Sequence, residues 1–207
     1  MSDVKEPIAN RPNNKTRRIF ITMSSRYKVY DHQIPVFVTS TVVGWIDALS
    51  REWYKELLCE SLQFCIDNKG LKLHAWVLMN NHFHLIVSAS AGHKIGDIMR
   101  DLKKFTAKRI IDAIAQNPEE SRKEWMINMF AFAGAHKADN EQYQFWQHDY
   151  HPITLDTGEK LRDRFAYLHN NPVKAGIVWD PEHYKYSSAI DYFTERPGLL
   201  PIVKLVL

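Results

Sequence analysis

This chain has few cysteines, no long hydrophobic run and little net charge, and each shortage excludes a class of protein. Its 207 residues include two cysteines, Cys59 and Cys65, which lie in one predicted helix. No further cysteine and no His-x-x-x-His pattern lies near them, so neither a disulfide framework nor a zinc finger is expected. We interpret both as reduced core residues, as in a cytosolic protein.

The sequence also lacks any apolar run of the roughly 20 residues that a membrane-spanning helix needs. Its N-terminus, MSDVKEPIANRPNNKTRR, is polar and does not have the apolar stretch of a signal peptide. Internal repeats and low-complexity tracts are missing as well, and 45% of the residues are hydrophobic. We therefore expect residues 1–34 to be an extension, residues 35–207 to form one compact domain, and the protein to be cytoplasmic with no membrane partner.

The most informative feature that is present is a pair of histidines in the run NNHFHLIV. The residues after Asn81 predict a strand, in which successive side chains point to opposite faces. His82 and His84 would then lie on one face about 7 Å apart, where two imidazoles can bind one metal ion. Phe83 and Leu85 would anchor the opposite face in the core. The same pattern can also be only the polar face of a half-buried strand, which is the more frequent case for so short a motif.

A second motif, YLHNNP, places a tyrosine on the polar side of a predicted helix. The helix is expected to start with a capping box of Asp156 and Glu159. Its apolar stripe consists of Leu161, Phe165 and Leu168. At about 100° per residue Tyr167 lies away from this stripe, on the side of Arg164 and Asn171. A core role for Tyr167 is therefore disfavoured, and its hydroxyl is expected to face a cleft as a candidate nucleophile.

The end of this helix carries a candidate for a third metal ligand. Pro172 is expected to stop the helix, because it lacks an amide hydrogen and pushes Asn171 out of helical dihedrals. Asn171 would then follow Tyr167 by one turn on the same face, where its amide oxygen could bind the ion held by the histidines. The alternative is that Asn171 only caps the helix. On spacing alone, His169 is a further candidate for the metal shell.

Aromatic and imidazole side chains cluster shortly before the tyrosine motif. The cluster consists of Trp146, His148, Tyr150 and His151. Such residues can stack on the bases of a single-stranded nucleic acid. For Trp146, packing in the core is at least as good an interpretation. His148 and His151 could instead join the metal shell.

Positive charge is concentrated on one predicted helix, although the formal net charge is only +3. Apolar positions between residues 95 and 109 form a core stripe, and a basic row on another side consists of Arg100, Lys103, Lys104 and Lys108. Such a row is most often only a solvated face. Beside a metal site and a nucleophile we interpret it as a track for a phosphate backbone, with Arg164 as a further contact. A second basic cluster, Lys15, Arg17 and Arg18, lies in the N-terminal extension.

The order of the predicted elements indicates an α+β, ferredoxin-like fold. We expect a strand at 35–45, a helix capped by Ser50 and ending before Gly70, a strand at 71–79, a strand from His82, the basic helix at 94–115, a shorter inserted helix at 119–132, a polar linker at 138–142 and a fourth strand at 143–154. The second and third strands form a hairpin, and the strand at 71–79 alternates apolar with polar side chains. The result is a βαββαβ antiparallel sheet with an inserted helix, against which the tyrosine-bearing helix packs.

Several stretches of the sequence, taken in order, resemble one protein family. They are LHAWVLMNNHFHLIV, IGDIMRDLKKFTAKRI, FWQHDYHPI, YLHNNPVKAGIV and YSSA. Together they are similar to the REP-associated tyrosine transposases of the HUH superfamily, and the similarity runs from Phe37 to Tyr192. The resemblance implies that His82 and His84 bind a divalent metal ion, Mg²⁺ or Mn²⁺, and that Tyr167 is the single catalytic tyrosine.

Two further positions bear on this resemblance. Insertion-sequence relatives place a third metal ligand four residues after the tyrosine, which is Asn171 here. Many members have Pro where this chain has Asn80, a difference just outside the ligands that is not expected to abolish metal binding.

The activity that the resemblance implies is cleavage and rejoining of single-stranded DNA at REP-like hairpins, through a 5′-phosphotyrosine intermediate. The expected partner is hairpin-forming single-stranded DNA at the nucleoid, and the expected assembly is a monomer or a homodimer. Two other functions fit the residues. One is a metal-dependent phosphodiesterase in which activated water attacks and Tyr167 only binds the substrate. The other is a non-catalytic module that binds single-stranded nucleic acid on the same scaffold.

Overall fold

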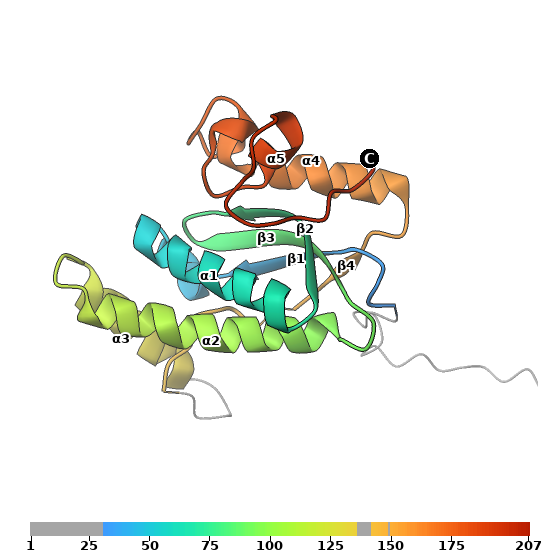
Figure 1. The fold of residues 1–207 in the computed structure, drawn as a ribbon. Coiled ribbons are helices and arrows are strands. Elements are labelled where there is room, and N and C mark those ends of the chain that lie inside the picture. Colours follow the sequence, from blue (N-terminus) through green and yellow to red (C-terminus); the bar gives the residue numbers. More distant parts are fainter. Residues whose placement is uncertain (1–30, 136–141, 149) are drawn as a thin grey trace, which may run out of the picture.

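The structure, a computed structural model, describes residues 31–135, 142–148 and 150–207. The basic cluster of Lys15, Arg17 and Arg18 lies outside these residues, as do positions 1–30 of the predicted extension and most of the predicted linker. The described residues form an antiparallel sheet with helices on both of its faces (Figure 1).

The sheet has the strand order β2-β3-β1-β4, and all neighbouring strands are antiparallel. Its strands are β1 Val36–Thr41, β2 Leu71–Leu78, β3 His82–Ala89 and β4 Ile153–Thr154. The helices between them are α1 Glu52–Asn68, α2 Ile95–Gln116 and the inserted α3 Lys123–Ala135. This order of elements and strands confirms the predicted ferredoxin-like fold, including the β2–β3 hairpin.

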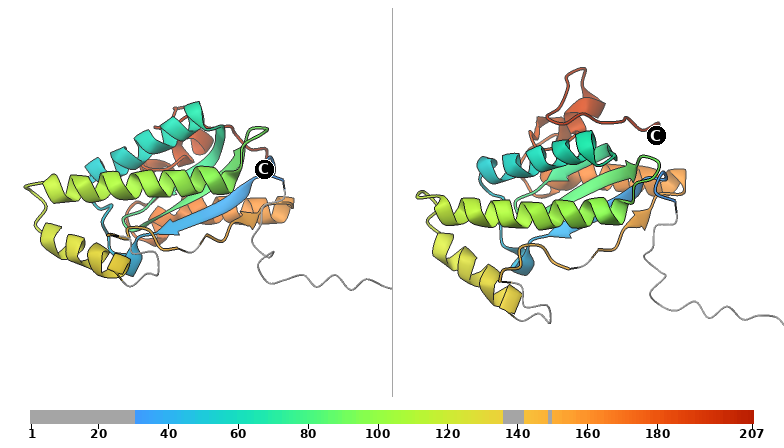
Figure 2. Two further views of the ribbon diagram at one scale, coloured as in Figure 1. Left: turned by 90° about the horizontal axis from the view of Figure 1, so that it is seen from below. Right: turned by 60° about the horizontal axis from the view of Figure 1, so that its bottom comes forward.

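Two helical layers cover the two faces of the sheet. On one face lie α1 and α2, and Figure 2 shows α2 running along that face. On the other lie α4 Gly158–Lys174 and α5 Ala189–Phe193. Two short 3-10 turns, η2 Val43–Trp45 and η3 Pro181–His183, lie in the connections. No helix in the described ranges is long and apolar enough to cross a membrane.

Coverage on both faces explains why β2 does not show the expected alternation of buried and exposed side chains. Lys72 is exposed, but His74 and Trp76 are buried together with their apolar neighbours. The pairing with β3 shifts at His74, between Leu73 and Ala75. A strand inside two helical layers has no solvated side, so its polar residues must find partners within the protein.

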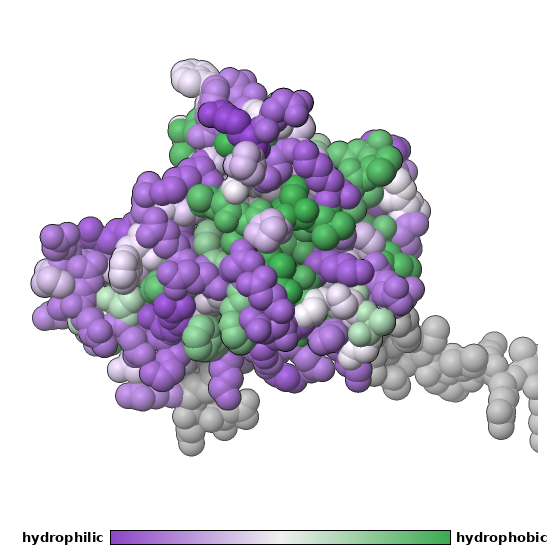
Figure 3. All heavy atoms as spheres, viewed as in Figure 1, coloured by the Kyte–Doolittle hydropathy of each residue, from purple (hydrophilic) through white to green (hydrophobic). Residues whose placement is uncertain are grey.

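The C-terminal segment supplies partners for His74 at the edge of the sheet. The amide of Val203 donates to the carbonyl of Leu73 at 2.8 Å, and Nδ1 of His74 donates to the carbonyl of Val203 at 2.8 Å. Nε2 of His74 then accepts from the hydroxyl of Ser88 at 2.8 Å. In Figure 3, apolar side chains gather over this segment and the sheet edge that it follows.

The predicted fourth strand is much shorter than expected. Of the residues between 143 and 154 that the structure describes, only Ile153–Thr154 forms a strand paired with β1, and Trp146 makes a single bridge to Val42. Pro152 directly before β4 has no amide hydrogen for a strand ladder. Trp146 instead turns its ring into the core, where it lies 5% exposed, packs against Phe83 and donates from Nε1 to Thr106 at 3.0 Å.

Both predicted ends of α4 are wrong. The N-cap is Thr157, whose hydroxyl accepts from the amide of Lys160, while Asp156 forms an ion pair with the Lys160 ammonium. Pro172 lies inside the helix, which continues to Lys174. A proline so near the end removes only one hydrogen bond, and the helix closes at Gly176, which has a φ of 68°.

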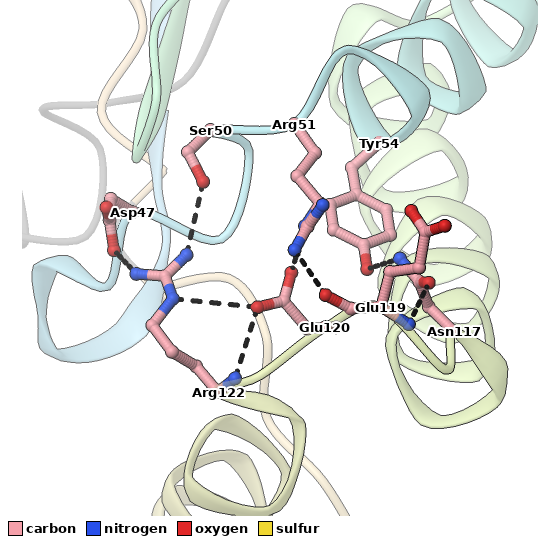
Figure 4. Close-up of polar contacts among 8 residues, drawn as sticks. All are labelled: Asp47, Ser50, Arg51, Tyr54, Asn117, Glu119, Glu120 and Arg122. Atoms are coloured by element: carbon pink, nitrogen blue, oxygen red, sulfur yellow. Dashed lines mark hydrogen bonds and ion pairs between the residues drawn. The ribbon is translucent and has the colours of Figure 1, made fainter.

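The start of α1 also differs from the prediction. Its N-cap is Arg51, without a side-chain cap, and Ser50 instead accepts from Arg122 at 3.1 Å. Both arginines bind Glu120, which is 4% exposed at the α2–α3 connection (Figure 4). Arg122 also contacts Asp47. This cluster fastens the inserted helix to the start of α1 and to the segment after η2.

Burial alone raises the pKa of Glu120, but the hydrogen bond from Arg51, the amide of Arg122 and both guanidinium charges bring the pKa below its ordinary value of 4.5. A carboxylate with a depressed folded-state pKa stabilises the fold above its unfolded pKa, and this stabilisation is lost as the pH falls through the folded value.

We therefore expect Glu120→Gln to lower the free energy of unfolding at pH 7 by about 1 to 3 kcal/mol, because hydrogen bonds to charged groups are lost. Below the ordinary glutamate pKa the wild-type protein should lose stability faster than the variant, so the two should converge. Urea unfolding at a series of pH values measures this. Glu119→Gln, at an exposed neighbouring carboxylate, is the matched control, and a constant gap between wild type and Glu120→Gln would contradict the assignment.

Candidate active site

Strand β3 places its two histidines on the face of the sheet that α4 covers. His82 pairs with Thr41 and His84 pairs with Thr39 on β1, so all four side chains share this face. The two imidazole ring centroids are 4.8 Å apart. His84 is buried at 4% exposure, and His82, the first residue of β3, is half-buried.

A polar partner fixes one nitrogen of each imidazole. Nδ1 of His84 lies 2.8 Å from the Thr39 hydroxyl, and Nδ1 of His82 lies 2.6 Å from Oδ1 of Asn81. The Asn81 amide is oriented by its own nitrogen, which donates to the carbonyl of Trp45 at 3.2 Å. Its oxygen can only accept, so Nδ1 of His82 carries the hydrogen and Nε2 keeps its lone pair.

Nε2 of His84 is a buried nitrogen for which the described residues provide no hydrogen-bond partner. When the Thr39 hydroxyl accepts from Nδ1, Nε2 presents a lone pair to the site. A buried polar atom without a partner is costly, and a ligating histidine is usually held through its other nitrogen in this way. The histidine pair therefore fits a metal ion on chemical grounds.

The protonation of both histidines suits the same role. Burial lowers the pKa of His82, although an interaction with the Asn171 side chain partly offsets the shift. Burial, together with smaller contributions from the charges of His82 and Arg164, lowers the pKa of His84 to about 3. Both rings are thus neutral at pH 7, as metal ligation requires.

Helix α4 brings Tyr167 to the histidine pair. The Tyr167 ring lies 5.2 Å from the His84 ring and 6.1 Å from the Phe37 ring, both in edge-on contact. Two cations flank it: the Arg164 guanidinium is 6.0 Å and the Lys174 ammonium 5.4 Å from its centroid. With 39% of its surface exposed, the tyrosine lies at the rim between the buried histidine and solvent.

Asn171 lies on the same side of α4, next to His82. Its amide nitrogen donates to the carbonyl of Tyr167 at 2.9 Å, and its side chain interacts with His82. The structure thus brings together His82, His84, Tyr167 and Asn171. Two imidazole nitrogens and an amide oxygen are donors suited to a divalent ion.

The other imidazoles lie elsewhere. His169 faces away from this site, since it is 1% exposed, lies 2.8 Å from the Ser188 hydroxyl through Nε2, and packs between Phe165 and the rings of α5. His148 and His151 are exposed in the segment that leads to β4. Among the described residues no group of three His, Cys, Asp or Glu side chains could hold a metal ion, so the candidate shell depends on Asn171.

Two predictions about nucleic-acid contacts need correction. Trp146 is a core residue, so its ring is unavailable for stacking on a base. The basic row on α2 does not adjoin Tyr167, because α2 and α4 cover opposite faces of the sheet. Within this row Arg100 pairs with Asp97 and Asp101, Lys108 pairs with Asp112, and Lys103 donates to the carbonyl of Gln147.

Lys174 and Trp45 lie at the site but were not predicted to. The spacing of Arg164, Tyr167, Asn171 and Lys174 places all four on one side of a helix, so the sequence carried a signal for Lys174 that the expected stop at Pro172 concealed. Trp45 reaches the site through the turn after β1, with its ring 6.3 Å from that of His82. No periodic pattern in the sequence indicates that contact.

Comparison with known proteins gives a family match and structural likenesses. Residues 36–138 match the family described as IS200-like transposases. A REP-associated tyrosine transposase bound to a REP hairpin has a similar fold, with a TM-score of 0.57 and 19% identity over 84% of this chain and 86% of that one. A candidate transposase from Deinococcus radiodurans R1 gives a TM-score of 0.40 and 19% identity over 70% of this chain and 94% of that one. No curated protein matches the sequence.

Thr39→Val should weaken metal binding, because it removes the hydroxyl that fixes His84 while keeping the shape of the side chain. We expect the affinity for Mn²⁺ to fall by about 10- to 100-fold, the usual effect of losing such a partner. Isothermal titration calorimetry measures it. Ser40→Ala removes a hydroxyl from the opposite face of the same strand and should leave the affinity unchanged, and equal affinities for Thr39→Val and wild type would show that Thr39 does not orient His84.

Proposed function

Because this chain belongs to the IS200-like transposase family, we propose that it cleaves and rejoins single-stranded DNA, with Tyr167 as the nucleophile. The observation that carries the proposal is the contact of the Tyr167 ring with His84, whose buried Nε2 lacks a partner among the described residues. The proposed nucleophile, Tyr167, thus lies next to a histidine whose Nε2 is available to bind a metal ion.

The ligands of the metal ion would be His82, His84 and Asn171, and the ion is proposed to be Mg²⁺ or Mn²⁺. When bound, a divalent ion polarises the scissile phosphate and stabilises the charge that develops on it. Asn81 holds His82 in the tautomer that ligation needs, and Thr39 holds His84 in it when its hydroxyl accepts from Nδ1. The neutrality of both rings follows from their burial.

In the proposed step the phenolic oxygen of Tyr167 attacks the phosphorus, and the bond from phosphorus to the 3′-oxygen breaks. The phosphate remains on Tyr167 as a 5′-phosphotyrosine. The phenol releases one proton to solvent and the departing 3′-oxygen takes up one proton. The step therefore has no net uptake or release of protons. Attack by another 3′-hydroxyl reverses it and rejoins the strand.

Arg164 and Lys174 are proposed to hold the phosphates on either side of the scissile bond. Both cations lie over the face of the Tyr167 ring, and Arg164 also lies 5.4 Å from the Phe37 ring. A flexible single strand can bend into the rim between them, whereas a duplex would first have to open. The structural likeness to a transposase bound to a REP hairpin supports a hairpin with a single-stranded flank as the substrate.

Replacing Tyr167 by Phe tests the chemistry, because it removes only the hydroxyl. We expect the wild-type protein, incubated with a labelled hairpin oligonucleotide and Mn²⁺, to form a covalent product that denaturing electrophoresis resolves. Tyr167→Phe should keep its fold and most of its affinity for DNA but form no adduct. Tyr54→Phe, which removes a phenolic hydroxyl from α1 on the opposite face of the sheet, is the matched control. Cleavage that persists in Tyr167→Phe would transfer the chemistry to water, and binding without cleavage by the wild type would favour a non-catalytic module.

A second test separates the cations at the site from those on α2. The double substitution Arg164→Gln and Lys174→Gln should weaken binding of single-stranded DNA and reduce the slope of log K against log salt by about 0.7 for each lost contact. Arg100→Gln with Lys108→Gln removes the same charge from the opposite face. A larger change of slope in the α2 variant, measured by fluorescence anisotropy, would move the DNA path to that face.

A further inference from the structure

Trp45 is an exposed aromatic side chain beside the candidate active site. It ends the turn η2 that follows β1, and 64% of its surface is exposed. Its ring meets the His82 ring edge-on, with 6.3 Å between centroids. A large apolar ring in this place gains little from burial in the protein itself.

The backbone of Trp45 is held in a conformation that tryptophan rarely adopts. Its φ is 57°, and among the described residues it is the one non-glycine residue with a positive φ. Gly44 precedes it with a φ of 62°, the Trp45 amide donates to Val42 at 3.1 Å, and its carbonyl accepts from Asn81 at 3.2 Å. Such strain persists only where the surroundings enforce it, and it gathers at sites that bind or react.

The same amide of Asn81 therefore fixes both the Trp45 backbone and the His82 ring. Orienting His82 requires only the oxygen of the Asn81 amide. The bond from the amide nitrogen to Trp45, a strained and exposed residue, therefore suggests a separate role for the indole. The backbone that carries the indole is therefore held beside His82, and the exposed ring is available to a ligand that binds there.

Trp45 and Tyr167 lie at opposite ends of the histidine pair. The rings contact one another in succession: the centroid of Tyr167 is 5.2 Å from that of His84, His84 is 4.8 Å from His82, and His82 is 6.3 Å from Trp45. The strand register agrees, because Tyr167 contacts Phe37 near the start of β1, whereas Trp45 follows the end of β1, where Thr41 pairs with His82.

We propose that Trp45 stacks on the unpaired base of the nucleotide that carries the leaving 3′-oxygen. This inference rests on the proposed function and specifies its substrate subsite. In a phosphoryl transfer the attacking and leaving oxygens are roughly in line, so the leaving oxygen departs on the side away from Tyr167, which is the side of Trp45. An indole face binds any base by stacking, so Trp45 contributes affinity with little sequence preference.

The test uses the full chain and oligonucleotides that carry 2-aminopurine, a base whose fluorescence falls on stacking. The cleavage position is mapped first from the wild-type products. The fluorescent base is then placed either directly 5′ or directly 3′ of that position. We expect binding to quench the 5′ base in the wild type and in Trp45→Tyr, and to leave it bright in Trp45→Ala and Trp45→Gly. The glycine variant tolerates the positive φ, so a loss there is not due to backbone strain.

Affinity provides the second measurement. Trp45→Ala should weaken binding by about 5- to 100-fold, as the loss of one stacked base does, and this effect should vanish on an oligonucleotide with an abasic site at the 5′ position. Trp53→Ala, which removes an indole of 60% exposure from α1 on the opposite face, should change neither signal.

Quenching at the 3′ position, or an equal loss on the abasic strand, would overturn the proposal for Trp45 while leaving cleavage by Tyr167 intact. If the wild type neither binds nor cleaves single-stranded DNA, the proposed function fails and this inference fails with it.

Discussion

The pairing of β1 with β3 in one register is the constraint on which the candidate site depends. It sets Thr39 opposite His84 and Thr41 opposite His82, so the hydroxyl that fixes an imidazole arrives with the strand itself. A slip of one residue would turn every side chain of β3 to the other face, with Phe83 in the site and the histidines in the core. The register is specified by packing on both faces, since Phe83 meets Trp146 on one side and His84 meets Phe37 on the other.

The second requirement is that α4 covers the histidine face without closing it. Phe165 and Leu168 are buried, and Phe165 packs against the rings of α5. His84, which contacts Tyr167 of the same helix, is buried as well, and its burial keeps the ring neutral. Tyr167 emerges from the same helix about 100° away from Leu168, where it remains partly exposed. The helix thus produces two environments at once, a dry one for the ligand and an open one for the nucleophile. A substrate has to approach only the open side.

The sequence was sufficient for the fold because the period of most elements can be recognised without knowledge of their contacts. Strands with period two, helices with period 3.6 and the short Asn80-Asn81 turn predict the ferredoxin-like order with no knowledge of the contacts. The histidine pair and Tyr167 were also predictable, since their placement needs only the period of one strand and one helix. The extent of the fourth strand was not, because Trp146 gains more from the core beneath β3 than from a ladder next to β1.

Long-range arrangement accounts for the remaining differences. The period of a helix does not state which face of the sheet the helix covers, so the basic row of α2 was expected beside Tyr167 and lies on the far side. The contact of Trp45 was not predicted for a related reason, because its approach to His82 depends on a positive φ that the residue type disfavours.

The turn that carries Asn80 shows how such contacts are held. Asn80 accepts from the buried ammonium of Lys55 at 3.0 Å and from the amide of Leu49 through its carbonyl at 2.8 Å. Burial lowers the pKa of Lys55, and the amide oxygen of Asn80 offsets part of that cost by accepting its hydrogen. A side-chain amide at this position therefore ties the turn to α1, and through the next residue, Asn81, the same tie reaches His82 and Trp45.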